Sequence, residues 1–217
     1  FVSSSSLTPK HKKILKINPY ADVTVFQSEF VRDNMLSNLN TQCWAVIING
    51  ADPQIFRFHQ QSGTYLGHIT NSVGNKKRLD LLNDTIVNYP NESFLLVGNH
   101  HKSPIGLLEY PNVTAVGHVA KTDIAKYHQH MKCLYYPSER DPCPNTVVEA
   151  IISGVPVCYH KDGGTKEIVR NCGLPLEQFD ELLSNLALFH DRCRTRKDLY
   201  FDSVAGKYLN CLEFRHT

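Results

Sequence analysis

Asp141 and Glu149 stand eight positions apart in the segment DPCPNTVVEAIISGVPV, residues 141–157. Carboxylates accept hydrogen bonds from hydroxyl groups, so a spaced pair could bind a hydroxyl-rich ligand at two points. Pro142 biases Asp141 toward an extended backbone, which places the first acid in a loop. The second acid stands in an otherwise apolar stretch.

A short helix over about residues 146–153 would carry the second acid. Asn145 is a suitable N-cap and Gly154 a suitable C′ residue. Polar residues recur at spacings of three and four, which places them on one narrow face: Thr146, Glu149 and Ser153. A solvated helix face usually carries several long charged side chains, whereas this face carries two hydroxyls and one carboxylate. The pattern predicts a helix that is buried nearly all round, with one slot for a polar group.

The start of this helix could bind an anion. Its first amides, at residues 145–147, lack partners within the helix and would suit a diphosphate. Glu149 could accept two hydrogen bonds from a vicinal diol such as a ribose, and Asp141 could accept them from hydroxyls on the other side of the phosphates. Together these groups would suit a nucleotide-sugar. The competing interpretation gives Glu149 only a structural role, as an acid stabilised by the dipole of the first helical turn.

Short apolar runs alternate with stretches of helical periodicity along the chain. The runs that predict strands are 21–27, 42–48, 64–69, 93–99, 113–117, 132–138 and 155–160. The other stretches that predict helices are 28–36 with Ser28 as N-cap, 76–89, 121–131 with Thr122 as N-cap, and about 177–190 and 196–213. This order predicts an α/β fold, a Rossmann-like open parallel sheet with helices on both faces. Ligands of such sheets bind at the carboxyl ends of the strands.

The composition is that of an ordinary globular protein. The chain has 217 residues, 41% of them hydrophobic and 20% charged, and its net charge of +2 selects neither nucleic acid nor membrane as a partner. No run approaches the roughly 18 apolar residues of a membrane span. The start, FVSSSSL, does not resemble a secretion signal, so we expect a cytoplasmic location. Phe1 in place of an initiator Met suggests a trimmed chain or a piece of a longer one.

The cysteines and histidines do not predict a metal site. The seven cysteines are an odd number, form no C-x-x-C pair and partly stand in apolar runs, which predicts reduced and mostly buried thiols. The histidine spacings are not those of metal ligands, and we interpret these four as polar surface residues: His100, His101, His128 and His130.

The segment DPCPNTVVEAIISGVPV, followed by DGGTKEIV, resembles the donor-binding segment of retaining GT-B glycosyltransferases of family 4, also called group 1. That family carries a Glu, seven residues, a second Glu, an Ala-rich helix, Gly-x-Pro-Val and a Gly-Gly loop that ends in Glu-Ile-Val. VIINGADPQIF (46–56) is similar to the family's linker between its two domains, and KKRLDLL (76–82) to its Lys-containing segment. FLLVGN (94–99) and the segment 113–138 follow in the expected order, so the resemblance runs from about residue 20 to about 170.

The resemblance implies a role for each matching residue. Asp141 would contact the donor sugar and Glu149 would hold the ribose. Lys77 would neutralise the phosphates and help the leaving group depart, so Asp141 and Lys77 are the expected catalytic residues. The other expected donor-binding residues are Asn145 and Thr146 at the helix end, Gly163, Gly164 and Thr165 in the glycine loop, and His118 and Val119 beside the base.

Two positions depart from the family pattern. The first Glu of the pair is Asp141 here, which is shorter by one methylene group. The arginine that the family often places soon after its first donor-domain strand has no clear match, because His68 stands near that position. His68 is therefore an expected donor-binding residue that could replace the arginine in part, and only when it is protonated.

The resemblance also implies a division of the chain. Residues 1–50 would be a remnant of an N-terminal acceptor domain with the interdomain linker, and residues 51–217 the nucleotide-sugar donor-binding domain. The expected function is the donor-binding part of a retaining glycosyltransferase, incomplete as an isolated chain and needing the acceptor domain or a partner subunit. We expect no cofactor and no metal besides the nucleotide-sugar substrate, and no nucleic-acid binding or stable membrane insertion. A non-catalytic nucleotide-sugar-binding module and a GT-B sugar-nucleotide epimerase are the alternatives.

Overall fold

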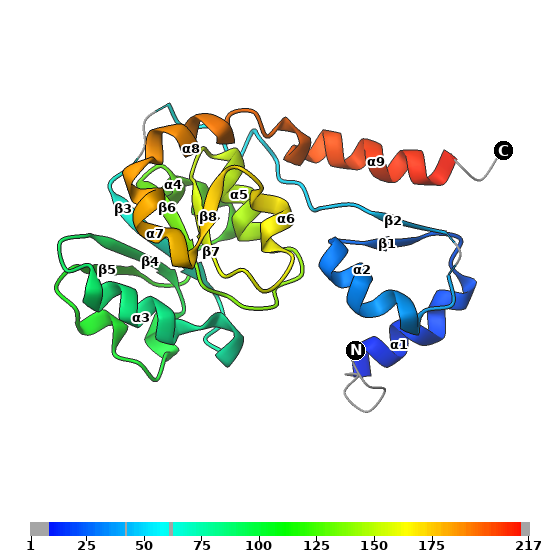
Figure 1. Cartoon of the computed structure of the whole chain (residues 1–217), viewed down its shortest axis with the longest axis horizontal. Coiled ribbons are helices and arrows are strands. Elements are labelled where there is room, and N and C mark those ends of the chain that lie inside the picture. The colour runs from blue at the N-terminus through cyan, green and yellow to red at the C-terminus, as the bar shows by residue number, and fades with distance from the viewer. Residues whose placement is uncertain (1–8, 42, 61–62, 214–217) are drawn as a thin grey trace.

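Six parallel strands form the main sheet of the protein (Figure 1). The structure, a computed structural model, describes residues 9–41, 43–60 and 63–213. In chain order the strands of the main sheet are β3 (Tyr65–Thr70), β4 (Phe94–Gly98), β5 (Val113–Val116), β6 (Met131–Tyr136), β7 (Val157–Tyr159) and β8 (Gly173–Pro175). Their spatial order is β5-β4-β3-β6-β7-β8, so the chain winds outward from β3 on one side and then outward from β6 on the other. The winding direction reverses between β3 and β6.

Helices cover both faces of this sheet. Successive apolar residues of its strands point to opposite faces and form two separate cores. Leu95, Val97 and Leu134 belong to one core cluster, together with residues of α4 (Ile124–His128), α5 (Asn145–Ile152) and α6 (Thr165–Val169). Phe94 and Leu96 belong to the other cluster, together with residues of α3 (Leu79–Asn88), α7 (Phe179–Ser184) and α8 (Leu186–Cys193). Burial on both faces explains why the strands are apolar without a polar side. The Rossmann-like α/β fold expected from the sequence is confirmed.

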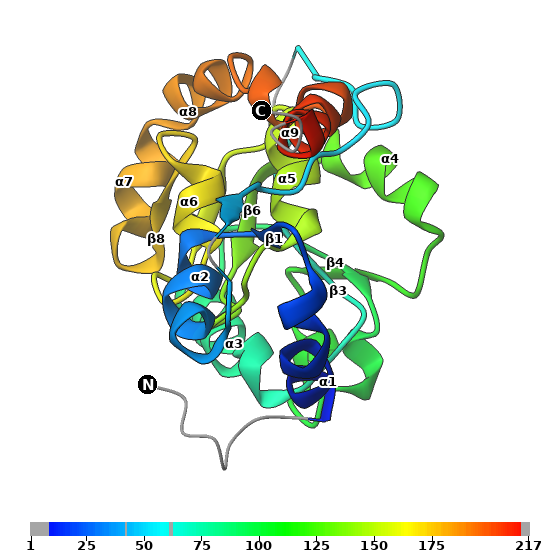
Figure 2. The ribbon, with the colours of Figure 1, turned by 90° about the vertical axis from the view of Figure 1, so that its right-hand side faces the viewer.

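The N-terminal segment forms a second, smaller unit. Strands β1 (Thr24–Phe26) and β2 (Trp44–Val46) pair in parallel as a two-stranded sheet, accompanied by α1 (Pro9–Ile17) and α2 (Glu29–Met35). Figure 2, seen from the side of this unit, shows α1 and α2 in front of the main sheet. The Ser28 hydroxyl accepts a hydrogen bond from the Val31 amide, which confirms the predicted N-cap of α2. Position 42, within a predicted strand, lies outside the described residues.

The linker between the two units runs beside the start of α9 (Phe201–Glu213). The Ala51 amide donates to the Leu199 carbonyl at 3.0 Å, and the Phe201 amide donates to the Ala51 carbonyl at 2.9 Å. In Figure 1, α9 leaves the main sheet and extends toward the side on which β1 and β2 lie. The last helix therefore flanks the connection between the N-terminal unit and the main sheet.

Some predicted helix starts are wrong. The stretch predicted as a helix from residue 76 begins with a 3-10 turn, Asn75–Lys77, and α3 starts only at Leu79 because Arg78 is left-handed, with φ of 46°. Thr122 is not an N-cap, because Lys121–Asp123 is a 3-10 turn ahead of α4. In contrast, Gly154 ends α5 with φ of 90°, as predicted for a C′ residue.

Five of the seven cysteines are buried and all seven are free thiols, in agreement with the sequence. The interpretation of the histidines was wrong for two of the four, because His100 and His128 are 2% and 0% exposed. Among the residues that the structure describes, none of the helices has the length and apolar composition needed to cross a membrane.

Candidate functional site

A pocket of about 530 Å³ opens at the carboxyl ends of β3 and β6, where the winding of the sheet reverses. Open α/β sheets bind ligands at this reversal, since the loops after the two strands diverge there. The pocket is lined by two segments: Ser72, Gly74, Asn75, Lys76 and Lys77 after β3, and Ser138, Glu139, Arg140, Asp141 and Pro142 after β6.

Lys77 and Asp141 line this pocket, and the buried Tyr136 contacts both of them from the end of β6. The Lys77 ammonium lies 3.5 Å from Asp141 Oδ2, and the Tyr136 hydroxyl donates to the same oxygen at 2.7 Å. Lys77 Nζ also lies 5.6 Å from the centre of the Tyr136 ring, in cation–π range. Burial and the neighbouring Asp141 carboxylate raise the pKa of Tyr136 well above its ordinary value, so its hydroxyl stays protonated and donates. The two expected catalytic residues are thus neighbours, although 64 positions separate them.

Polar contacts between the two loops position Lys77. The Glu139 amide donates to the Lys76 carbonyl at 2.9 Å, and Arg78 reaches Glu139 at 3.4 Å and Asp80 at 2.7 Å. The guanidinium of Arg78 therefore joins the start of α3 to the loop after β6. The 3-10 turn before α3 turns Lys77 toward Asp141 instead of placing it on a helix face.

The glycine loop packs directly on the backbone of Asp141. The Gly164 amide donates to the Asp141 carbonyl at 2.9 Å, and Gly163 pairs with Asp141 in an isolated β-bridge. Gly163 has φ of 130°, and a Cβ atom at Gly164 would lie 2.0 Å from the Pro142 carbonyl oxygen, so both positions require glycine. Thr165 is 1% exposed, and its hydroxyl has no hydrogen-bond partner among the described residues. The structure therefore brings the expected loop to the expected acid.

Helix α5 starts one residue earlier than predicted. Pro144 occupies the N-cap position and, within the described chain, no side chain caps the helix. Asn145 is its first residue, and its amide oxygen accepts a hydrogen bond from Asn49 Nδ2 at 2.8 Å instead of capping. Thr146 follows, half-buried. The first-turn amides of α5 therefore have no side-chain acceptor from the described residues, which leaves them suited to an anion.

Glu149 is a buried carboxylate on α5. Its side chain is 4% exposed, and its nearest cation is Lys121 Nζ, 3.5 Å from Oε1. Burial raises the pKa of Glu149, and Lys121 opposes that rise. Glu149 is the fifth residue of the helix, so the competing interpretation, an acid in the first turn, does not fit its place. A neighbouring pocket of about 560 Å³ is lined by Asn49, Gly50, Lys121, Asn145, Phe201, Val204, Ala205, Tyr208 and Leu209.

The protein itself fills part of the predicted polar face of α5. Ser153 is fully buried: its hydroxyl donates to the Glu149 carbonyl at 2.8 Å and lies 3.2 Å from His128 Nδ1. His128 therefore occupies that end of the face. Thr146 and Glu149 remain as the polar residues near the start of the helix.

His118 and Val119 lie after β5, apart from Lys77 and Asp141. His118 is exposed and its Nδ1 lies 3.2 Å from Asn71 Oδ1, so the loops after β5 and β3 touch there. Val119 is half-buried and packs against the core on the α5 side. Both residues lie at the same edge of the sheet as Asp141.

The expectation that a protonated His68 replaces an arginine is wrong. His68 is 1% exposed, lies within β3 and has its Nδ1 2.7 Å from His100 Nε2. Burial, with His100 and Lys77 adding to it, lowers the pKa of His68 well below its ordinary value. His68 is therefore neutral and supplies no positive charge to a donor phosphate.

Sequence reasoning missed Tyr136, Lys121 and Asn49. Tyr136 ends strand β6 five positions before Asp141, and its place at a carboxyl strand end was a usable signal. Lys121 and Asn49 contact Glu149 and Asn145 from distant segments. Those contacts depend on the tertiary fold and have no local signature.

A family model described as glycosyl transferases group 1 matches residues 62–186, which is more than half of the chain. The chain belongs to this family. The matched range contains the strands β3–β8, Lys77, the two acids and the glycine loop. Membership makes this a chain of the glycosyltransferase class, and it confirms the resemblance found in the sequence.

Solved glycosyltransferase structures share the fold of this group 1 chain. HepE of Anabaena, solved with UDP, is 16% identical with a TM-score of 0.79 over 98% of this chain and 70% of HepE. TarM of S. aureus is 20% identical with a TM-score of 0.74 over 97% of this chain and 47% of TarM. Sucrose-phosphate synthase of Thermosynechococcus elongatus is 16% identical with a TM-score of 0.76 over 98% of this chain and 63% of the synthase. The chain therefore spans about half to two thirds of these proteins. A search of curated protein sequences finds no significant match.

Proposed function

We propose that this chain is the donor-binding part of a retaining glycosyltransferase and takes a nucleotide-diphosphate sugar. The observation that carries the proposal is the 3.5 Å approach of Lys77 to Asp141 at the reversal of the sheet, beside the glycine loop. A cation next to a hydroxyl acceptor suits the junction between a diphosphate and a sugar. HepE, which shares the fold, was solved with UDP and with UDP-glucose.

In this proposal each region of the site takes one part of the donor. Lys77 and the first amides of α5 face the diphosphate, Asp141 and the glycine loop face the sugar, and Glu149 accepts hydrogen bonds from the ribose. His118 and Val119 border the base. Lys121 pairs with Glu149 at this position and is 71% exposed, so its side chain can move aside for the ribose at small cost.

Transfer breaks the bond between the anomeric carbon and the phosphate oxygen of the donor. The acceptor hydroxyl oxygen forms the new bond to that carbon on the same face, and its proton passes to the departing diphosphate. Lys77 and the helix amides stabilise the negative charge that develops on the diphosphate. We propose that these groups perform this task without a metal ion.

We further propose that residues 1–50 belong with an acceptor-binding unit and that residues 51–217 form the donor-binding domain. The two strands β1 and β2 support this division, because parallel strands normally lie in larger sheets that are covered on both faces. Additional strands, from the acceptor domain or a partner subunit, would complete that small sheet.

Calorimetry with UDP, GDP and ADP tests the donor site. At least one nucleotide should bind, and Glu149→Ala should weaken its binding at least tenfold, about 1.4 kcal/mol. Lys77→Ala should weaken the nucleoside diphosphate more than the matching nucleoside. The matched control is Lys126→Ala, since Lys126 is 72% exposed and pairs with Asp123 away from the pocket. Failure of all three nucleotides to bind would contradict the proposal, and equal losses of nucleotide and nucleoside would remove the role of Lys77.

A further inference from the structure

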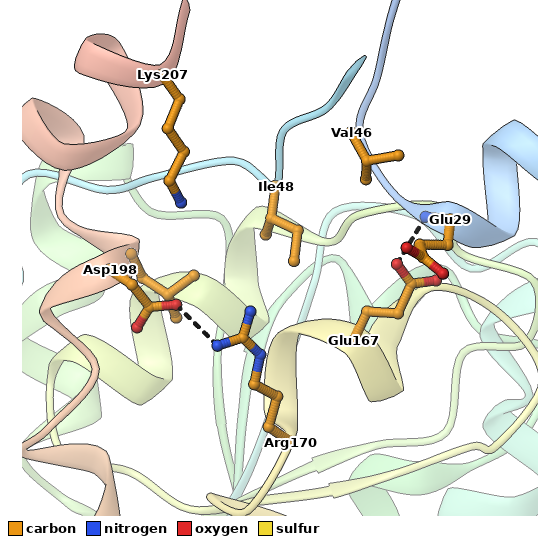
Figure 3. Close-up of a pocket in the computed structure, with 8 residues that line it drawn as sticks. Glu29, Val46, Ile48, Glu167, Arg170, Asp198 and Lys207 are labelled. Atoms are coloured by element: carbon orange, nitrogen blue, oxygen red, sulfur yellow. Dashed lines mark hydrogen bonds and ion pairs between the residues drawn. The ribbon is translucent and has the colours of Figure 1, made fainter. Parts of the chain in front are cut away.

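Glu167 joins the main sheet domain to the N-terminal unit. It lies on α6, directly after the glycine loop, and its two carboxylate oxygens accept hydrogen bonds from the amides of Glu29 and Phe30 at 2.6 and 2.8 Å. These amides open α2, 138 and 137 positions away in the chain. Figure 3 shows the Glu167 side chain directed from α6 toward the start of α2.

Glu167 completes the capping of α2. The Ser28 hydroxyl accepts from the Val31 amide and the Ser28 carbonyl from the Arg32 amide, so the two remaining first-turn amides are the ones that Glu167 binds. A helix of seven residues is marginal by itself and depends on such contacts. A carboxylate that accepts from helix N-terminal amides makes strong, charge-assisted hydrogen bonds.

The same contact presses α2 onto the glycine loop. Ser28 is fully buried, and a Cβ atom at Gly164 would lie 2.7 Å from its hydroxyl oxygen. The Gly164 amide in turn donates to the Asp141 carbonyl. A continuous chain of contacts therefore links Glu167 to the start of α2, and then Ser28 to Gly164 and Asp141.

Apolar packing does not fill the space beside this contact. A hollow of about 370 Å³ separates α6 from β2 and α9, and its lining includes Val46, Ile48, Arg170 and Lys207 (Figure 3). The Glu29 side chain, which also borders the hollow, is 60% exposed and pairs with Arg32 at 3.4 Å, so it is not a competing anion for the amides. The docking of α2 therefore depends strongly on the two hydrogen bonds to Glu167.

We propose that Glu167 is a positioning residue of the donor site: by holding α2 against Gly164 it fixes the glycine loop next to Asp141, and so couples the N-terminal unit to the sugar end of the pocket. The coupling itself follows from the contacts between Glu167, α2 and the glycine loop. Its effect on sugar binding rests on the proposed function. Loss of the carboxylate then frees α2 and the glycine loop together, and affects a bound sugar more than a bound nucleotide.

Hydrogen–deuterium exchange of the whole ligand-free chain tests the coupling. Glu167→Gln should speed exchange at least tenfold in two separate peptides, one over residues 28–35 and one over residues 161–167. The matched control is Glu181→Gln, which makes the same chemical change at an exposed residue of α7 that accepts a hydrogen bond from Gln178, outside both peptides. Faster exchange at α2 alone, or at neither peptide, would overturn the proposal.

Two further variants decide the matter if Glu167→Gln does not fold. Glu167→Asp is shorter by a methylene group and should show a smaller increase in both peptides. Glu29→Pro removes one donor amide while keeping α2, because proline is favoured at the first helical position and Ser28 before it is extended, with φ of −161° and ψ of 159°. It should speed exchange of residues 161–167, and an unchanged loop would overturn the proposal.

Binding of UDP and UDP-glucose separates positioning from general destabilisation. We expect Glu167→Gln to keep the UDP affinity within twofold and to lower the ratio of UDP-glucose affinity to UDP affinity at least fivefold. An unchanged ratio would overturn the positioning role. If wild type binds neither compound, that result counts against a uridine donor, and the exchange data on the ligand-free chain still decide the coupling.

Discussion

At the scale of single residues, the hydroxyl of Tyr136 determines how Asp141 is held. Tyr136→Phe removes a hydrogen bond of 2.7 Å to a carboxylate, and such bonds contribute about 1.5–3 kcal/mol. We expect a lower free energy of unfolding, and, because the proposed function places Asp141 beside the sugar, a larger loss of UDP-glucose affinity than of UDP affinity. Urea denaturation and calorimetry measure the two effects.

Tyr89→Phe is a control for this prediction at the same residue scale. Tyr89 also donates to a carboxylate, Asp180 at 2.6 Å, but at a place remote from the pocket. It should affect stability without changing the ratio of the two affinities. If both variants changed that ratio equally, Tyr136 would have no specific link to the sugar.

Individual side chains also show what could be predicted from the sequence. The family pattern placed Asp141 and Lys77 in one site, and they are in contact. It could not show that His68 and His100 are buried together, because the burial of a polar side chain depends on a partner from another strand or loop. The same holds for His128, at the end of α4, and Ser153, at the end of α5, whose side chains are 3.2 Å apart.

At the scale of elements, the left-handed conformation that glycine favours predicted the end of α5 correctly. The starts of α3 and α4 were less predictable. The backbone of Arg78 has a left-handed conformation, so α3 begins only after it. An arginine gives no indication of that conformation in the sequence. Gly154 has φ of 90°, and a Cβ atom there would lie 3.0 Å from the Phe58 ring and 3.2 Å from His190 Nε2. Gly154→Ala should therefore lower the free energy of unfolding by about 1–2 kcal/mol or more.

The matched element-scale control is Gly206→Ala, in the interior of α9. Among the described residues, a Cβ atom at Gly206 meets nothing within 4 Å apart from its own helix backbone and chain neighbours, and alanine favours a helix over glycine by about 0.5–1 kcal/mol. The two variants make the same chemical change in different backbone conformations. Urea denaturation should therefore show a lower free energy of unfolding for Gly154→Ala and a higher one for Gly206→Ala. A neutral or stabilising Gly154→Ala would contradict the left-handed end of α5.

At the scale of the whole molecule, buried neutral histidines make the stability depend on pH. Burial lowers the pKa of His128 to about 3 and that of His100 to about 4, and burial with His100 and Lys77 lowers that of His68. Below the ordinary value of 6.5 the unfolded chain binds protons that the folded chain does not. The free energy of unfolding therefore falls as pH decreases from 6.5, by about 2 kcal/mol each for His128 and His100 between pH 6.5 and 5, and His68 acts in the same direction.

Glu149 acts in the opposite direction, because burial raises its pKa and the folded chain then binds a proton before the unfolded chain does. A difference between variants isolates the histidine contribution. Urea denaturation at pH 6.5 and pH 5 should show a pH-dependent loss of stability in wild type that is about 2 kcal/mol smaller in His128→Gln. The control is the exposed His118→Gln, which removes a surface histidine instead of a buried one and should resemble wild type. An equal pH dependence in all three proteins would contradict a neutral His128 in the folded state, which its complete burial beside Ser153 favours.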